Sequence, residues 1–341
     1  MRLAVVGATG AVGTEILRLL EERAFPVDEL VAVASPRSAG RSLVFSGAKI
    51  EVRALAEDVF DGVDLALFDV PDEVSASWAP RAAGRGAVVI DNSGAWRLDP
   101  EVPLVVPEVN PEAAADRPKG IIASPNCTML TLVVPLAALH RAAGLRRVIV
   151  SSYQSASGAG KPGVDELWEQ LQRAAKEEEA VTSGLARDVL EGGPTFGHPL
   201  ALNVIPRIAS VRDNGYTGEE LKVGDETRKV LGLPELPVAA TCVRVPTVIG
   251  HALSIHASFA RPIGVDEARR VLAEAPGVEV LDDPANGVYP TPLQAAGRDP
   301  CFVGRIRQDL YDPSSLLLFA AADNLRKGAA LNTVQIAELL V

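Results

Sequence analysis

A cysteine stands at the point where a helix is expected to begin, in the segment Ser124-Pro125-Asn126-Cys127-Thr128. An apolar, strand-like run over residues 120–123 precedes this segment, and a helical pattern over residues 130–140 follows it. A thiol at a helix N-terminus faces unpaired backbone N–H groups and the positive end of the helix dipole, and both favour the nucleophilic thiolate. The segment therefore predicts a nucleophilic Cys127, although a lone cysteine is often only a small buried hydrophobic residue.

A glycine-rich turn joins the first predicted strand, residues 3–6, to the first predicted helix, residues 12–20. The turn reads Gly7-Ala8-Thr9-Gly10-Ala11-Val12-Gly13, a G-x-x-G-x-x-G spacing that departs from the commoner G-x-G-x-x-G. Such a turn brings the backbone close to a pyrophosphate and directs helix N–H groups at the phosphates. We predict a dinucleotide site here rather than a purely structural turn. Its predicted contacts are Gly7, Thr9, Gly10, Ala11, Val12 and Gly13.

The end of the second predicted strand, residues 30–34, is where NAD enzymes usually carry an Asp or Glu for the ribose 2′-hydroxyl. Here the strand is followed by Ser35-Pro36-Arg37-Ser38, which contains no carboxylate. An arginine flanked by hydroxyl groups suits a 2′-phosphate instead. We therefore predict NADP as the cofactor, held by Ser35, Arg37 and Ser38. The alternative is that Arg37 is a solvated loop charge.

The composition is that of an ordinary globular protein, with 48% hydrophobic and 23% charged residues. The chain has 341 residues, more than one typical core holds, so two domains are expected. The net charge of −11 argues against general binding to nucleic acid or to a membrane surface, because both are anionic. Cys127, Cys242 and Cys301 are too widely spaced for a disulfide framework or a zinc site, so we expect no metal. Without a visible signal peptide or bilayer-spanning run, the expected location is the cytoplasm.

Short apolar runs alternate with helical patterns over residues 1–125, which is typical of a parallel sheet covered on both faces. The strands are expected at residues 3–6, 30–34, 65–68, 87–90 and 121–123, with helices at 12–20 and 75–83. Longer strands follow residue 145 and indicate a mixed or antiparallel sheet with helices on one face. They are expected at residues 147–153, 238–245, 251–259, 277–281, 301–306 and 315–321, with helices at 163–175, 218–230 and 265–274. Residues 324–340 are predicted to form one long helix, of the kind that packs back on a first domain.

Two histidines lie on the predicted strand at residues 251–259. Strand alternation places His251 on one face and His256 on the other, so at most one of them points into a given site. His140 belongs far along the helix that follows Cys127, and His198 belongs to a loop. A single histidine is more often structural than catalytic, so the pattern alone does not select one.

Four charged residues stand where they can bind an anionic or zwitterionic ligand. Arg244 interrupts an apolar strand, where its charge needs either a buried partner or a substrate carboxylate. Glu219 and Lys222 share one face of a predicted helix, and an ordinary surface pair is the simplest interpretation of them. Arg97 lies in a loop beyond a parallel strand, and loops at that edge of such sheets bind ligands.

The chain closely resembles the aspartate-semialdehyde dehydrogenases over nearly its whole length. The segments that carry the resemblance occur in that family's order and are highly specific together: GATGAVG, ASPRSAG, DNSGAWR, VPLVVPEVN, SPNCT, SYQSASGAGKPG, GYTGEELKVGDET, RVPTVIGHALSI and DNLRKGAALNTVQIAE. The resemblance implies an α/β fold with a Rossmann-type NADP-binding domain closed by the C-terminal helix. It also implies an α+β catalytic and dimerisation domain with a mixed sheet. The expected boundaries are residues 1–126 and 325–341 for the first domain and 127–324 for the second.

The resemblance implies a reaction as well as a fold. Such enzymes reduce L-aspartyl 4-phosphate to L-aspartate 4-semialdehyde with NADPH and release phosphate, on the route to lysine, threonine and methionine that includes diaminopimelate. They act as homodimers, some paired into tetramers. The chemistry is consistent with the residues, because a thiolate displaces phosphate from an acyl phosphate and leaves a thioester that accepts hydride.

The same resemblance assigns roles to residues that match the family's segments. Cys127 becomes the nucleophile, His251 the acid/base, and Gln154 the residue that orients the acyl intermediate. Arg244 holds the substrate α-carboxylate and Glu219 its α-amino group. The remaining assignments are Lys222 and Arg97 for the phosphate, and Ser157, Gly158 and Asn324 for the cofactor.

Three positions depart from the family's usual residues: Gly94 and Trp96 in DNSGAWR, and Met129 after NCT. None carries an expected chemical role, so the departures concern packing. Two alternatives remain open. The nearer is another acyl-phosphate reductase, of the N-acetyl-glutamyl-phosphate reductase or glyceraldehyde-3-phosphate dehydrogenase type, for which an amine-binding Glu219 has no use. The other is a non-catalytic NADP-binding sensor.

Overall fold

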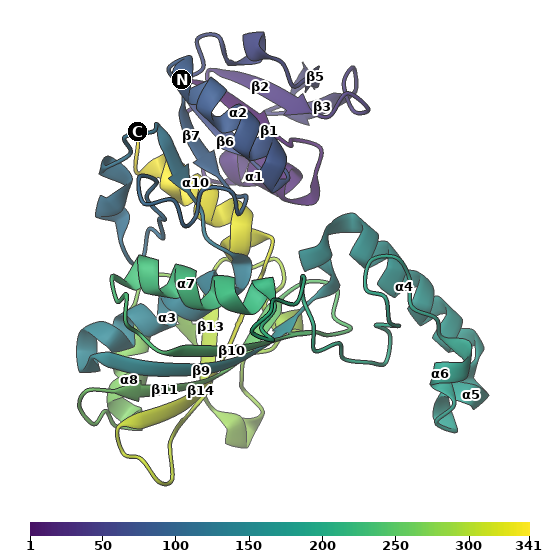
Figure 1. Ribbon diagram of the computed structural model, residues 1–341, viewed down its shortest axis with the longest axis vertical. Coiled ribbons are helices and arrows are strands. Elements are labelled where there is room, and N and C mark those ends of the chain that lie inside the picture. The colour runs from purple at the N-terminus through teal and green to yellow at the C-terminus, as the bar shows by residue number, and fades with distance from the viewer. The chain divides into compact units, whose positions relative to one another are not determined.

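A parallel six-stranded sheet forms the centre of the first of two units in the computed structural model, which describes residues 1–341 (Figure 1). This first unit comprises residues 1–134, 225–235 and 325–341. Its strand order is β5-β2-β1-β6-β7-β8. The strands are β1 (Arg2–Val6), β2 (Glu29–Ala34), β5 (Arg53–Ala54), β6 (Leu65–Phe68), β7 (Val88–Asp91) and β8 (Ile121–Ala123).

The helices of the first unit bury the apolar faces that the sequence predicts. They are α1 (Ala11–Glu22), α2 (Asp72–Gly84) and α10 (Leu331–Glu338). Ile16 of α1, Val334 of α10 and Leu3 of β1 belong to one buried core, because an apolar stripe on each helix packs on the sheet. The predicted strands and helices of residues 1–125 are confirmed, with ends that differ by a few residues.

The prediction of one long helix over residues 324–340 is confirmed for residues 326–338, but the first part of that helix is not α-helical. Residues Arg326–Ala330 form a π-helical turn before α10, and the N–H of Ala330 bonds to the carbonyl of Leu325. The wider turn carries two buried cations that reach carboxylates within the first unit. Arg326 bonds to Glu15 at 3.0 Å, and Lys327 bonds to Glu108 at 2.7 Å. The hydrophobic period alone does not report such a turn.

A small hairpin, β3 (Ser42–Phe45) and β4 (Ala48–Glu51), was not predicted from the sequence. Ser46 and Gly47 both adopt positive φ in its two-residue turn, which is the geometry that such hairpins need. Phe45 is buried, and Leu43 and Ile50 pack against the same core, whereas Val44 between Leu43 and Phe45 is 70% exposed. The apolar run of β3 therefore does not show the alternation by which a half-buried strand is usually recognised.

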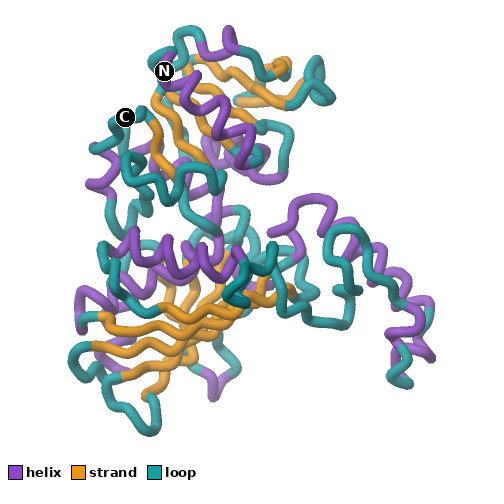
Figure 2. The backbone as a smooth tube through the Cα atoms, in the orientation of Figure 1, coloured by secondary structure: helices purple, strands orange, loops and turns teal.

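The second unit, residues 135–224 and 236–324, is built on a mixed six-stranded sheet (Figure 2). Its strand order is β10-β9-β11-β14-β13-β12, with parallel pairing only at β10/β9 and β12/β13. The strands are β9 (Leu145–Gln154), β10 (Val238–Arg244), β11 (His251–Phe259), β12 (Val278–Val280), β13 (Cys301–Gln308) and β14 (Ser315–Ala322). Along β11 the residues from Leu253 alternate between buried and half-buried, so one face of the sheet is covered more fully than the other.

The remaining helices complete the two units. The second unit contains α4 (Gly160–Lys176), α5 (Glu178–Thr182), α6 (Ala186–Val189), α8 (Val265–Ala273) and α9 (Pro292–Ala295), and residues of both units form α3 (Cys127–Ala143) and α7 (Gly218–Leu231). Short 3₁₀ turns lie at Glu57–Phe60, Pro111–Ala115, Ala156–Ala159 and Pro284–Asn286. No helix combines the length and apolar character required to traverse a bilayer. The prediction of an α/β fold with a parallel sheet and a second, mixed sheet is confirmed.

Candidate functional site

The glycine turn between β1 and α1 has no room for side chains at two of its positions. Gly7 has φ +97°, and a Cβ on it would lie 2.1 Å from the backbone oxygen of Asp69. A Cβ on Gly13 would lie 2.1 Å from the backbone oxygen of Gly7. Gly10 is the N-cap of α1 and supplies no capping side chain, so the first N–H groups of the helix face the turn uncovered. This cradle of backbone groups fits the pyrophosphate of a dinucleotide.

The predicted 2′-phosphate segment lies at the same edge of the first sheet. β2 pairs in parallel with β1, with Val33 opposite Val6, so residues after both strands meet at one edge. The N–H of Ser38 bonds to the carbonyl of Ser35 at 2.8 Å and forms a turn that holds Arg37 exposed. An exposed guanidinium at this edge is accessible to an anionic ligand.

Cys127 is the first residue of α3 and is half-buried. The Oδ1 atom of Asn126 accepts hydrogen bonds from the N–H groups of Thr128, at 2.9 Å, and Met129, at 3.3 Å. Asn126 therefore caps the helix, and Cys127 lies within the capped first turn. The position is the one that the sequence predicts for a thiol stabilised as its thiolate.

Arg97 is buried against the same corner of the chain. Its Nε donates to the carbonyl of Ser124 at 2.9 Å, and its Nη2 donates to the carbonyl of Asn92 at 2.5 Å. Its Nη1 forms an ion pair with Glu226 at 3.2 Å. The other oxygen of Glu226 accepts the N–H of Asn126 at 2.6 Å. One carboxylate thus joins Arg97 to the residue before Cys127. Glu226 was not among the predicted site residues, since its place in a charged helix gives no sign of its burial.

A second cluster of predicted residues lies in the second unit and surrounds the loop after β9. The Nε2 of Gln154 donates to Glu219 at 3.2 Å, and both side chains are buried. Interpreting Glu219 and Lys222 as an ordinary surface pair is therefore wrong for Glu219. Lys222 is half-buried and lies one turn further along α7.

The ring of His251 is fully buried, with 0% of the residue exposed. The backbone N–H of Ser155 donates to its Nδ1 at 3.1 Å, so the proton of the neutral ring is on Nε2. Burial and the nearby charge of Arg244 lower the pKa of His251 to about 3, against the opposing effect of the carbonyl of Gly250. His251 is therefore neutral at ordinary pH and presents an N–H donor.

Gly158 leaves space for two of these side chains. A Cβ on Gly158 would lie 2.8 Å from Nη1 of Arg244 and 3.2 Å from Nε2 of His251. The same Nη1 donates to the carbonyl of Ser155 at 2.6 Å. The Oδ1 of Asn324 accepts from the hydroxyls of Ser155, at 3.0 Å, and Ser157, at 3.2 Å. Five predicted residues thus gather around the loop after β9: Ser157, Gly158, Arg244, His251 and Asn324.

Arg244 also lines a cavity of about 640 Å³ in the second unit. Phe196, Arg207 and His198 are among the other lining residues, and the Arg244 guanidinium lies 5.8 Å from the centre of the Phe196 ring. Two guanidinium groups facing one cavity suit a carboxylate ligand.

The other histidines lie outside this cluster. His256 contacts Asp309 at 2.8 Å from the opposite face of β11, as strand alternation predicts. The Nδ1 of His140 accepts the N–H of Leu145 at 3.0 Å near the end of α3. His198 is an exposed loop residue. His198 lines the same cavity as Arg244, but of the four only His251 is buried and bonded to the loop after β9, through the N–H of Ser155.

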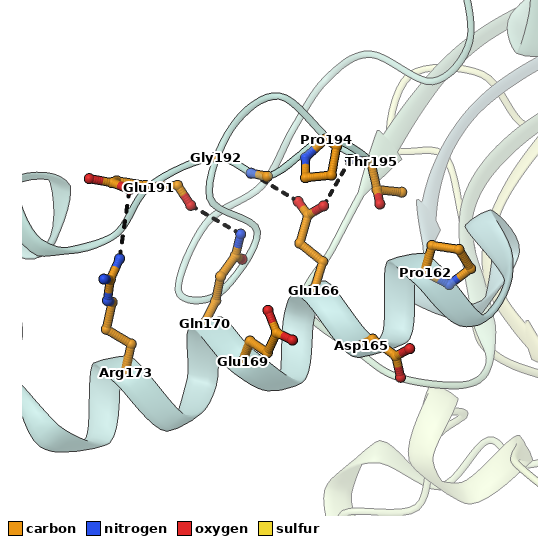
Figure 3. A pocket seen from close by; sticks show the side chains of 11 residues that line it. Pro162, Asp165, Glu166, Glu169, Gln170, Arg173, Glu191, Gly192, Pro194 and Thr195 are labelled. Atoms are coloured by element: carbon orange, nitrogen blue, oxygen red, sulfur yellow. Dashed lines mark hydrogen bonds and ion pairs between the residues drawn. The ribbon is translucent and has the colours of Figure 1, made fainter.

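A separate acidic cavity of about 530 Å³ lies between α4 and residues 191–195 (Figure 3). The carboxylate of Glu166 accepts the N–H groups of Gly193, at 3.2 Å, and Thr195, at 2.8 Å. Gln170 donates to the carbonyl of Glu191 at 3.2 Å. These buried polar groups hold the loop to the helix, so they have a structural role.

Comparison with known proteins agrees with both halves of the fold. The family model of the semialdehyde dehydrogenase NAD-binding domain matches residues 2–117, and that of the semialdehyde dehydrogenase dimerisation domain matches residues 136–327. An aspartate-semialdehyde dehydrogenase of Streptomyces akiyoshiensis is 51% identical over 100% of this chain and 98% of its own length. One from Aquifex aeolicus is 49% identical over the same shares.

A solved structure from the same family has the same fold. Aspartate semialdehyde dehydrogenase II of Vibrio cholerae, in a complex with ASA, superposes with a TM-score of 0.92 at 44% identity, over 99% of this chain and 97% of that one. Two matching domain models and similarity along the full length leave no part of the chain unaccounted for. The chain belongs to the aspartate-semialdehyde dehydrogenase family, oxidoreductases with a Rossmann-type NAD-binding domain and a dimerisation domain.

Proposed function

We propose that this chain reduces L-aspartyl 4-phosphate to L-aspartate 4-semialdehyde and phosphate with NADPH, in the cytoplasm, for lysine, threonine, methionine and diaminopimelate biosynthesis. The observation that carries the proposal is the capped first turn of α3, where Cys127 follows Asn126 and the buried Arg97 is held at the same corner. A nucleophile and an anion-binding group at one corner suit displacement of phosphate from an acyl group.

Cys127 is proposed to attack as the thiolate. A carbon–sulfur bond forms at the acyl carbon, and the bond from that carbon to the phosphate oxygen breaks, with the electron pair leaving on phosphate. The product on Cys127 is a thioester. The N–H groups in the first turn of α3 are the proposed donors to the developing oxyanion, and Arg97 and Lys222 are the proposed phosphate ligands.

The nicotinamide supplies the hydride that reduces the thioester when the cofactor is bound. The residues proposed to hold the cofactor are Gly7, Thr9, Gly10, Ala11, Val12, Gly13, Ser35, Arg37, Ser38, Ser157, Gly158 and Asn324. NADP rather than NAD is proposed because the segment after β2 offers Arg37 and two hydroxyls but no carboxylate.

The second unit is proposed to hold the amino-acid part of the substrate. Arg244 grips the α-carboxylate through its guanidinium, and Glu219 accepts the α-ammonium group. Gln154, bonded to Glu219, orients the acyl group. His251 is the proposed acid/base: the Nε2–H of its neutral ring donates a hydrogen bond to the oxygen that becomes charged as the tetrahedral adduct forms. When the adduct collapses to the aldehyde, the carbon–sulfur bond breaks and its electron pair returns to the Cys127 thiolate.

We further propose that the chain works as a homodimer, or as a pair of dimers. The dimerisation-domain match over residues 136–327 supports association of two copies. For the domain organisation we propose a nucleotide-binding domain of residues 1–126 and 325–341, and a catalytic and dimerisation domain of residues 127–324.

The reverse reaction provides the test. Phosphate-dependent oxidation of L-aspartate 4-semialdehyde is followed by the absorbance of NADPH, with NAD and N-acetyl-glutamate semialdehyde as parallel comparisons. We expect turnover only when phosphate, the free amine and NADP are all present. Turnover of the acetylated aldehyde alone contradicts the substrate and the role of Glu219. No turnover of either aldehyde, in protein that still binds NADP, contradicts the enzyme itself and favours a sensor.

A further inference from the structure

Asp69 lies at the place in the first sheet where the order of the strands reverses. The chain runs from β1 outward through β2 and returns to β6, which pairs with β1 on its other side. Ligands of open parallel sheets bind at this reversal, beyond the carboxyl ends of the strands. Asp69 directly follows β6, and its N–H bonds to the carbonyl of Val6 at 2.8 Å.

Both the backbone and the carboxyl group of Asp69 face the glycine turn. A Cβ on Gly7 would lie 2.1 Å from the backbone oxygen of Asp69, so this oxygen excludes a side chain there. The Oδ2 atom lies 3.8 Å from the position of a Cβ on Gly10, the N-cap of α1. A carboxyl group therefore stands beside the backbone cradle that fits a pyrophosphate.

The surroundings of Asp69 disfavour its negative charge. Burial and the carboxylate of Asp91 raise its pKa to about 6, against the opposing effect of the Asn92 amide. Asp91 ends the neighbouring strand β7 and is bonded to the hydroxyls of Ser75, at 2.7 Å, and Ser93, at 2.5 Å. Burial raises the pKa of Asp91, and the charge of Arg97 opposes this shift.

Two further groups complete the polar surroundings of this corner. Asp72, at the start of α2, accepts the N–H of Gly94 at 2.7 Å. The Nδ2 of Asn92, the amide that favours the ionised form of Asp69, is buried. No cation contacts Asp69, so a bound anion adds a like charge to a carboxyl group that is already hard to ionise.

We propose that Asp69 is a further cofactor-contact residue, which binds the dinucleotide as the neutral acid and donates its proton to a cofactor oxygen. The ionised carboxylate takes one proton from solvent on binding, and the resulting O–H donates to the anion instead of repelling it. The inference rests on the dinucleotide site of the proposed function. It does not depend on the aldehyde substrate or on the choice between NADP and NAD.

Isothermal titration calorimetry tests the proposal with NADPH and NADH as the probes. Titrations at pH 8 in two buffers of different ionisation enthalpy give the number of protons taken up per cofactor bound. We expect a value close to one for the wild type and a lower value for Asp69→Asn. Above pH 6 the wild-type Kd should rise, by at most about tenfold per pH unit, and the rise should be smaller in Asp69→Asn.

The 2′-phosphate of NADPH also titrates near pH 6 and adds its own protons to the measured uptake. For each cofactor, the proton uptake is therefore compared between wild type and variant. Glu73→Gln is the matched control, because it removes the same charge from an exposed position four residues along the chain. It should keep the wild-type proton uptake. Thermal unfolding of Asp69→Asn, and a second variant, Asp69→Ser, separate a binding effect from a folding defect.

Weaker binding by Asp69→Asn at every pH, with no proton uptake by the wild type, overturns the proposal. That result makes Asp69 an ionised acceptor for a ribose hydroxyl. Equal proton uptake by wild type and Asp69→Asn also overturns it. Failure of the wild type to bind either cofactor contradicts the dinucleotide site itself, and with it this inference.

Discussion

Arg97 and Glu226 form a buried ion pair between residues 129 positions apart in the chain, with Nη1 and Oε1 separated by 3.2 Å. The side chain of Glu226 is 1% exposed and that of Arg97 is 10% exposed. Glu226 also accepts the N–H of Asn126, the cap of the helix that Cys127 begins. A single carboxylate therefore fixes a proposed phosphate ligand and the backbone beside the proposed nucleophile.

Replacing Glu226 by Gln tests this arrangement. The variant keeps an acceptor but loses the charge, which weakens the charge-assisted hydrogen bond that holds the Arg97 guanidinium in place. We therefore expect the KM for phosphate in aldehyde oxidation to rise about tenfold. Removal of a negative charge near Cys127 should also speed thiol alkylation by iodoacetamide, because the thiolate is then less disfavoured. Steady-state kinetics and alkylation rates measure the two effects.

Asp225→Asn is the control for Glu226→Gln, since Asp225 is the adjacent residue and pairs instead with Arg228 at 2.7 Å. Its kinetics and alkylation should match those of the wild type. An unchanged phosphate KM in Glu226→Gln argues that Arg97 does not bind phosphate.

Cys127→Ala should abolish turnover and leave dinucleotide binding nearly unchanged, because the thiolate is the proposed attacking group and the glycine turn is intact. The measurements are the aldehyde oxidation assay and calorimetric titration with NADPH. Cys301→Ala provides the comparison. Cys301 is fully buried in β13, so this variant should lose stability, by about 1 kcal/mol, while it keeps activity. Substantial turnover by pure Cys127→Ala rules out the covalent route.

Arg37→Ala should weaken NADPH binding by about ten- to a hundredfold and NADH binding much less, since only NADPH carries the 2′-phosphate that a guanidinium binds. Dissociation constants for both cofactors give the selectivity directly. Arg41→Ala, four residues along and also exposed, should leave the ratio unchanged. Equal losses for the two cofactors in Arg37→Ala contradict the proposed contact.

The buried His251 should make the protein less stable as the pH falls. Its pKa is about 3 in the folded state and near 6.5 when exposed, so between these values the unfolded state binds more protons. The free energy of unfolding should therefore decline as the pH is lowered from 6.5 towards 3. Asp69, whose pKa is raised to about 6 in the folded state, has the opposite effect. Between pH 4 and 6 the folded state binds more protons at this residue, so its contribution to the free energy of unfolding rises as the pH falls.

Urea unfolding at several pH values isolates the histidine contribution. We expect His251→Gln to decline less steeply than the wild type below pH 6.5. His256→Gln, which changes the half-buried histidine on the opposite face of β11, should follow the wild type more closely. Parallel pH profiles for wild type and His251→Gln contradict a buried neutral ring.

The sequence by itself determined the order and type of most elements, because each depends on a local period of apolar residues. It also placed the glycine turn, since Gly7 and Gly13 lie where side chains clash with backbone, and it placed Cys127 at the start of α3. The site residues selected through the resemblance lie around those features and around the loop after β9. These predictions follow from residue type and near neighbours.

Only the tertiary structure decided how charged residues distant in sequence are paired. Glu226, Asp225 and Glu220 look alike in a charged helix, yet Glu226 alone reaches Arg97, because that pairing depends on where α7 lies within the fold. The contact of Gln154 with Glu219 likewise depends on where α7 lies, and the approach of Asp69 to the glycine turn is set by strand order. A local pattern fixes which face of an element is apolar, whereas the partner of a buried charge is fixed by the long-range packing that removes both groups from water.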